Sequence, residues 1–317
     1  MDQYELRVAG ANDEAALLEL FAAVFGETRT AEEWHWKYGA SRTLAARYAP
    51  ADSLVAVDGR GDIVGHAGAL TLPGCFQGSP IPFVQVCDVM VHPRHRGGLG
   101  RNNLFTLMLR DLLSRIAERL PTAFRYGFPG RRPYLIGERS GVYASMEMAV
   151  ESLLSGPRSF ANPWRVGPLS WDDVRIDSIW DRSRDQCRLS LIRDRAYLRW
   201  RYAENPSHRY RLHGLTRLGR LGGWAVCSEG GAGPSVVDFL VPRASAARAL
   251  GALAADPQVA FDRKALRVWL PRDYRSGIGS PGLETPVVVA NMRWASAIDT
   301  EMAANLLYYT MGDVDIH

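Results

Sequence analysis

The sequence is poor in cysteine and contains no long apolar run. None of its four cysteines, Cys75, Cys87, Cys187 and Cys227, lies in a CxxC spacing. This argues against a zinc knuckle or a disulfide framework and fits a reducing compartment. No run of about 18 apolar residues is present, so we expect no transmembrane helix. The start, Met1–Glu5, lacks a basic stretch followed by an apolar one, so we expect no secretory signal and a cytoplasmic protein.

Charge of one sign is also scarce, since the formal net charge is only +4. The positive charge is almost all arginine and is spread along the chain, which suits an anionic ligand but is too weak alone to indicate nucleic acid. No group of histidines and carboxylates has metal-ligand spacing, so we expect no metal. A length of 317 residues with 47% hydrophobic residues suggests two domains with buried cores.

Hydrophobic periodicity places the elements of the first half. Apolar residues at helical spacing predict helices at 12–25 and 104–120 and a short helix at 133–140. Short apolar runs predict strands at 54–57, 63–67, 82–91, 123–128 and 142–153. The first two strands flank a turn rich in Asp and Gly and should form an antiparallel hairpin. A chain of this kind is an α/β protein with a mixed sheet.

The second half repeats the first. The segment Trp36-Lys37-Tyr38 matches Trp200-Arg201-Tyr202, at an offset of 202 − 38 = 164. The segment Asp88-Val89-Met90-Val91 matches Asp238-Phe239-Leu240-Val241. A hairpin at 212–226, a helix at 244–255 and a strand at 266–270 follow the same order. We interpret this as a duplication, with domains at 1–155 and 171–317 joined by a linker at 156–170 that is rich in Ser, Gly and Pro.

A loop rich in glycine and arginine lies between the strand at 82–91 and the helix at 104–120. It reads His92-Pro93-Arg94-His95-Arg96-Gly97-Gly98-Leu99-Gly100-Arg101. Glycines let backbone amides approach a phosphate closely, and a helix N-terminus adds unpaired N–H donors and partial positive charge. Taken alone, the loop predicts a site for a pyrophosphate or a similar anion. A solvated basic turn is the alternative.

The order of elements and the VHP-x-x-RG run resemble the GNAT (GCN5-related N-acetyltransferase) family and its coenzyme A loop. The resemblance covers roughly 4–155 and, more faintly, 171–317. The Trp-x-Trp-Lys-Tyr element and the ending Tyr308-Tyr309-Thr310-Met311-Gly312-Asp313 are similar to a bacterial subfamily with two GNAT domains in tandem. The resemblance therefore implies two tandem GNAT-like domains.

The resemblance also implies an N-acyltransferase that uses acetyl-CoA or another acyl-CoA. Its acceptor would be a small-molecule amine, such as an amino sugar or a natural-product intermediate. The amine would dock in the cleft between the two halves of the chain. We expect a monomer or a homodimer. The amine would attack the thioester directly. The backbone of Val89, Met90 and Val91 would pair with the pantetheine arm. The pyrophosphate would be held by Arg96, Gly97, Gly98, Leu99, Gly100 and Arg101.

Two residues are candidates for proton transfer. Asp88 lies where several family members place an acidic residue and could be the general base. It could instead be a structural carboxylate paired with an arginine, and Asp238 at the matching place favours this alternative. The family often uses a tyrosine as the acid that protonates the leaving thiolate. The position of that tyrosine aligns with Gly137, one helical turn after Tyr134. Tyr134 could act as the acid in its place, or it could pack.

Trp34, Trp36 and Tyr38 could line an acceptor pocket, although aromatic residues at such spacing more often pack between helices.

The loop departs from the family's glycine pattern, because Gly98 and Gly100 each come one position early. This keeps two alternatives open. One is a transferase of the Fem type, which has a duplicated GNAT fold and uses aminoacyl-tRNA. The other is a binding protein without catalysis. The second half has only Pro242–Ser245 in place of the loop, so we expect a single active half.

Overall fold

The computed structural model describes residues 4–97, 103–154, 161–230, 233–259, 265–276, 278, 282–294 and 296–314. The chain divides into two compact units, each built from segments distant in sequence. The first unit comprises Met1–Pro73, Ile81–Glu147 and Pro286–Ala304. The second comprises Gly74–Pro80, Met148–Thr285 and Asn305–His317.

The first unit is built on a mixed sheet with the strand order β1-β2-β3-β4-β5-β13-β6. The strands are β1 (Tyr4–Val8), β2 (Leu54–Asp58), β3 (Ile63–Phe76), β4 (Ser79–Val91), β5 (Phe124–Gly127), β6 (Tyr143–Leu154) and β13 (Leu283–Met292). The helices are α1 (Glu14–Phe25), α2 (Ala31–Trp34), α3 (Ser41–Leu44), α4 (Leu104–Arg119), α5 (Arg131–Arg139) and α9 (Thr300–Leu306). Strands β4 and β5 are parallel, whereas β13 runs antiparallel to β5.

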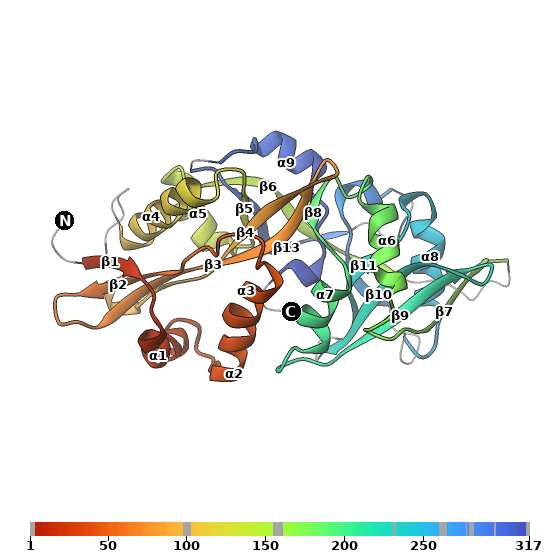
Figure 1. Ribbon diagram of the computed structural model, residues 1–317, viewed down its shortest axis with the longest axis horizontal. Helices are drawn as coiled ribbons and strands as arrows, with labels where there is room; N and C mark the ends of the chain where they lie inside the picture. The colour runs from red at the N-terminus through yellow and green to blue at the C-terminus, as the bar shows by residue number, and fades with distance from the viewer. Residues whose placement is uncertain are drawn as a thin grey trace. The chain divides into compact units, whose positions relative to one another are not determined.

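Alternation along the strands decides which helix covers which face. Val55 packs with Leu17, Leu20 and Phe21 of α1. Its neighbours point to the opposite face, where α4 lies, so α1 and α4 cover the two faces of the sheet (Figure 1). Helix α4 buries an apolar stripe that includes Leu109, Leu112, Leu113 and Ile116.

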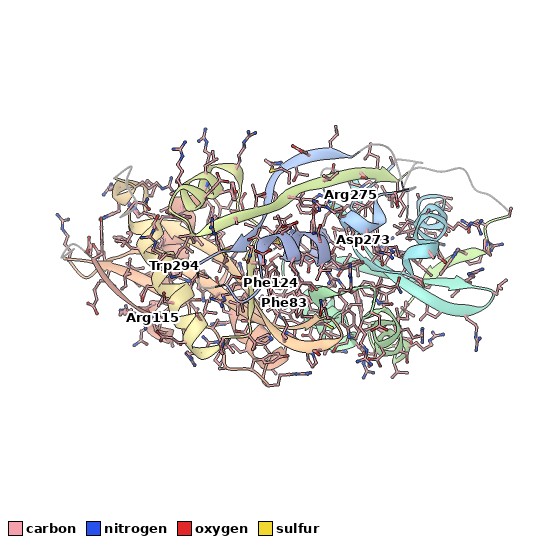
Figure 2. All side chains as sticks on the ribbon, turned by 90° about the horizontal axis from the view of Figure 1, so that it is seen from above. Phe83, Arg115, Phe124, Asp273, Arg275 and Trp294 are labelled. Atoms are coloured by element: carbon pink, nitrogen blue, oxygen red, sulfur yellow. The ribbon has the colours of Figure 1, made fainter. Side chains whose placement is uncertain are left out.

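Aromatic contacts hold β4 and β5 together where the two strands run in register. The rings of Phe83 and Phe124 meet edge to face, with their centroids 5.1 Å apart (Figure 2). The indole N–H of Trp294, in the segment after β13, donates to the Ser114 hydroxyl of α4 at 3.0 Å. The C-terminal quarter of the sequence therefore contributes both a strand and a helix contact to the first unit.

The second unit has the strand order β6-β12-β11-β10-β9-β7. Its strands are β7 (Trp164–Pro168), β8 (Leu189–Leu191), β9 (Tyr210–Arg217), β10 (Arg220–Gly230), β11 (Gly233–Leu240) and β12 (Leu266–Trp269). Its helices are α6 (Arg175–Ser183), α7 (Arg195–Leu198) and α8 (Ala246–Ala254). Strand β8 pairs with residues 74–76 at the end of β3.

The predicted helices and strands are present in both halves within a few residues of the expected bounds, except that the strand predicted at 63–67 continues to Phe76 as β3. The compact units, however, are not the two consecutive segments 1–155 and 171–317. Strands β6 and β13 each run from one unit into the other, so each unit includes a strand from the opposite half of the sequence. Of the linker predicted at 156–170, Trp164–Pro168 forms strand β7, which pairs with β9.

Adding a methyl group at Gly127 of β5 tests how closely this strand approaches its neighbours. A Cβ on Gly127 would lie 2.9 Å from the Val86 carbonyl oxygen of β4 and 2.7 Å from Cε of Met292 of β13. We therefore expect Gly127→Ala to lower the free energy of unfolding by about 1–3 kcal/mol, measured by urea denaturation. The control is Gly251→Ala in α8, where a Cβ meets nothing within 4 Å. This control should raise stability by about 0.5–1 kcal/mol, because alanine is the better helix former. Equal stability of Gly127→Ala and the wild type would contradict the packing.

Candidate active site

Strand β4 is kinked at Asp88, four residues before the glycine- and arginine-rich loop. Asp88 has φ of 43°, in the left-handed region that residues other than glycine rarely adopt. Such a conformation costs free energy and persists only where the surroundings impose it. The kink therefore needs a physical cause, and the contacts of Asp88 provide one.

One oxygen of the Asp88 carboxylate accepts from three donors, which lie just before α2 and on the turn after it. This atom, Oδ2, accepts from Lys37 Nζ at 2.7 Å, from Arg29 Nη1 at 2.8 Å and from the Tyr38 hydroxyl at 2.6 Å. The side chains of Asp88 and Lys37 are each only 4% exposed. Burial alone would raise the pKa of Asp88. The Lys37 ammonium and the Arg29 guanidinium outweigh it and hold that pKa well below its usual value.

His66 of β3 holds the backbone of the kink. Its Nδ1 lies 2.8 Å from the Asp88 carbonyl oxygen, so Nδ1 carries the proton and donates it. Its Nε2 is buried and has no hydrogen-bond partner among the described residues. Burial lowers the pKa of His66 to about 4, because a proton on Nε2 would find neither water nor an acceptor.

Local sequence brings the donors to Asp88. Thr30 caps α2 through a reciprocal pair of hydrogen bonds with Glu33, which places Arg29 just before the helix. The chain then continues as a π-helical turn, η2 (His35–Ala40), which carries Lys37 and Tyr38. Gly68 makes room for the Tyr38 hydroxyl, because a Cβ there would meet that oxygen and would lie 2.7 Å from the Cys87 carbonyl oxygen.

The second unit repeats this cluster around Asp238. The carboxylate accepts from Arg193 Nε at 3.1 Å, from the Tyr202 hydroxyl at 2.8 Å and from the Thr310 hydroxyl at 2.9 Å. Arginine and tyrosine occur at the same offset from their counterparts, 193 − 29 = 164 and 202 − 38 = 164. Tyr202 also lies on a π-helical turn, η4 (Arg199–Ala203).

This repetition bears on the prediction that Asp88 is a general base. A carboxylate whose one oxygen already accepts three hydrogen bonds, and whose pKa is lowered, attracts a further proton weakly. The same arrangement stands in the half that lacks the Gly/Arg loop. The contacts therefore favour the structural alternative, in which Asp88 fixes β4 against the first helices.

Tyr134, the candidate acid, lies on α5. Its hydroxyl donates to Glu138 Oε1 at 2.5 Å and accepts from the Ser145 N–H at 3.1 Å. Burial and Glu138 raise the pKa of Tyr134 to about 12. Gly137, which aligns with the family's tyrosine, has no space for a side chain, because a Cβ would lie 2.7 Å from Cε2 of Tyr143. These contacts favour packing for Tyr134.

The predicted cofactor segment is described only in part. The register between β4 and β5 covers three residue pairs and ends at Gln85↔Tyr126, while β4 continues to Val91. Met90 is buried against α1, and Val89 is half-exposed. The Val91 carbonyl oxygen accepts from Arg96 Nε at 2.9 Å.

Beyond this point the loop reaches an exposed Gly97. The predicted phosphate-binding residues Gly98, Leu99, Gly100 and Arg101 lie outside the described residues. Helix α4 then begins at Leu104, with Asn103 as its N-cap: the Asn103 side chain accepts from the Thr106 N–H at 2.9 Å. The predicted strand therefore precedes the loop, and the predicted helix N-terminus follows it.

Two of the three predicted acceptor aromatics contact each other, since the ring centroids of Trp34 and Tyr38 lie 4.5 Å apart. Trp34 is buried in the core with the apolar residues of α1, and Trp36 is half-buried. Tyr38 lines a cavity of about 140 Å³ together with Ser41, Arg42 and Thr71. Sequence reasoning missed Arg29, Lys37 and His66. The offset of 164 shared by Arg29 and Arg193 was the signal that could have found the first.

Two features are absent from the described segments. No three His, Cys, Asp or Glu side chains among them come together as a metal site requires. Within the same part of the chain, no helix combines the length and apolar character needed to cross a membrane.

Comparison with known families decides the identity of this arrangement. Residues 5–141 match the model of a family described as acetyltransferase (GNAT) domain. Residues 5–141 form a GNAT domain. This segment contains the kinked β4, the Gly/Arg loop and α4. No curated protein sequence matches the chain.

Solved structures extend the GNAT fold over nearly the whole chain. A probable N-acyltransferase from Enterococcus faecalis V583 has a TM-score of 0.67 at 16% identity, over 92% of this chain and 73% of that one. A tandem GNAT protein from the clavulanic acid biosynthesis pathway has a TM-score of 0.54 at 17% identity, over 94% of this chain and 100% of that one. Saccharomyces cerevisiae N-myristoyltransferase with bound myristoyl-CoA has a TM-score of 0.55 at 10% identity, over 92% of this chain and 82% of that one. The predicted tandem GNAT fold is therefore confirmed.

Removing the charge of Asp88 tests its structural role. Asp88→Asn leaves Lys37 and Arg29 buried without their carboxylate, and we expect the free energy of unfolding to fall by about 3–5 kcal/mol. The matched control is Asp111→Asn, which breaks an exposed i,i+4 pair with Arg115. It should cost less than about 0.5 kcal/mol in the same urea denaturation. A fall of less than about 1 kcal/mol in the free energy of unfolding of Asp88→Asn would contradict the structural role of Asp88.

The pH dependence of stability should report on His66. The folded pKa is about 4, whereas an unfolded histidine titrates near about 6.5. Between these values the unfolded chain binds more protons, so stability is lost as pH falls. We expect wild type to lose about 2 kcal/mol more than His66→Gln between pH 7 and pH 5, measured by urea unfolding at each pH. His208→Gln, at an exposed position, should keep the wild-type slope. Parallel curves for wild type and His66→Gln would rule out the buried imidazole as the cause.

Proposed function

We propose that this protein is an N-acyltransferase that moves an acetyl or longer acyl group from acyl-CoA to the amine of a small molecule. One observation carries the proposal: a GNAT domain whose kinked β4 runs into a loop rich in glycine and arginine, followed by the N-terminus of α4. Backbone amides, guanidinium groups and a helix N-terminus together favour a pyrophosphate.

The acyl-CoA would lie along the end of β4. The backbone of Val89, Met90 and Val91 would pair with the pantetheine arm, beyond the last register pair with β5. The segment from Arg96 to Arg101 would hold the pyrophosphate. We assign to Asp88 a positioning role, because its lowered pKa and three donors suit a fixed anion better than a proton acceptor.

The reaction would proceed by direct attack of the amine. The amine nitrogen forms a bond to the thioester carbonyl carbon, the carbon–sulfur bond breaks, and coenzyme A leaves as the thiolate. The proton lost by the attacking nitrogen passes through water and finally protonates the thiolate. In this scheme the enzyme contributes position and an oxyanion contact from the backbone of β4.

The acceptor would enter from the side of the first helices. The cavity of about 140 Å³ beside η2 and β3 is lined by the polar residues Tyr38, Ser41, Arg42 and Thr71. These groups suit a polar acceptor that carries hydroxyls, such as an amino sugar. This cavity replaces the trio Trp34, Trp36 and Tyr38 as the proposed acceptor site, with Tyr38 retained.

Calorimetry with acetyl-CoA, longer acyl-CoAs and free CoA tests the proposal. Loss of one charge-assisted phosphate contact in Arg96→Ala should weaken acyl-CoA binding about 10-fold or more. Arg60→Ala, an exposed arginine of the β2–β3 turn in the same unit, should leave affinity unchanged.

Other outcomes of the calorimetry would overturn the proposal. Absence of binding to every CoA species, together with salt-sensitive binding of aminoacyl-tRNA, would favour a transferase of the Fem type. Absence of both would favour a binding protein without catalysis.

A further inference from the structure

A second pocket, of about 610 Å³, lies in the second unit at the start of β9. Its floor is the β9–β10 pair, where Arg211 stands directly opposite Cys227 in the antiparallel register. One wall is the segment after α8, which Asp256 orders by accepting from the N–H groups of Gln258 and Val259. The volume lies in the range of sites that hold small metabolites.

The pocket is basic. Arg209, Arg211 and His208 line it with exposed side chains, and no Asp or Glu occurs among its described lining residues. Arg211 and His213 are two residues apart on β9, so their side chains leave the same face of the strand. Two arginines and a histidine that line one pocket suit an anion with several oxygen atoms.

His213 is the feature that the fold leaves unexplained. The residue lines this pocket and is only 8% exposed. Its Nε2 is buried and has no hydrogen-bond partner among the described residues. Burial lowers the pKa of His213, so the imidazole is neutral near pH 7. A buried polar nitrogen without a partner is costly, and a ligand oxygen that accepts from it would remove that cost.

We propose that this pocket binds a small oxyanion-bearing metabolite, a phosphate or a carboxylate, between Arg209, Arg211 and the Nε2–H of His213. The pocket lies at β9, whereas the counterpart of the Gly/Arg loop in this unit follows β11, at Pro242–Ser245. It is therefore a site separate from the proposed acyl-CoA loop and does not depend on acyl transfer.

NMR of the full chain with ¹³C-labelled histidine tests this site. Inorganic phosphate and acetate are added separately at constant ionic strength, and His213→Gln identifies the His213 signal. We expect at least one of the two anions to shift that signal saturably, and comparison of the two titrations distinguishes phosphate from carboxylate. The same anion should raise the thermal unfolding midpoint by mass action.

Two arginine variants provide the matched comparison. Arg211→Ala should weaken the response of the His213 signal at least about 10-fold, because it removes a charge-assisted contact. Arg217→Ala removes an exposed arginine of the same strand that does not line the pocket, and it should titrate as wild type. Both substitutions are at exposed positions, and an unchanged thermal unfolding midpoint without added anion checks that folding is retained. An equal response of the two variants, or an unmoved His213 signal with both anions, would overturn the proposal.

Discussion

The buried carboxylate of Asp88 joins the sheet of the first unit to its first helices. Three donors from Arg29, Lys37 and Tyr38 converge on one oxygen, while His66 holds the carbonyl of the same residue. These contacts offset the cost of a left-handed backbone in the middle of a strand. The direction in which β4 enters the Gly/Arg loop depends on that kink. A buried charge therefore acts through geometry, whatever its net contribution to stability.

The two halves of the chain use this device with different partners. In the second unit Arg193 and Tyr202 bind Asp238, as Arg29 and Tyr38 bind Asp88. The residue matching Lys37 is Arg201, and it donates instead to the carbonyl oxygens of Gly312 and Val314. The arginine and the tyrosine thus have the same role in both halves, whereas the second cation has different partners. The second unit has Pro242–Ser245 in place of the Gly/Arg loop and carries a basic pocket at β9.

Sequence patterns located the long helices and most strands of the first half but did not reveal the contacts of single side chains. Periodicity of 3.6 found α1 and α4, and apolar runs found β2 to β6, because these signals are local. The sequence predicts Asp88 as a possible base because it lies where several GNAT family members place an acidic residue. The donors that hold it are separated from it by 50 or more residues, and no local pattern reports them. Tyr134 was similarly visible, whereas its capture by Glu138 and Ser145 was not.

The sequence by itself determined the duplication, the succession of elements and the place of the basic loop, because repeats and periodicity are carried by neighbouring residues. Only the tertiary structure decided that β6 and β13 each cross from one unit to the other. Only the tertiary structure, likewise, made Asp88 a fixed anion and left Nε2 of His66 and of His213 buried without described partners. Strand exchange, burial and the pKa values that follow from burial are set by segments that meet only after folding.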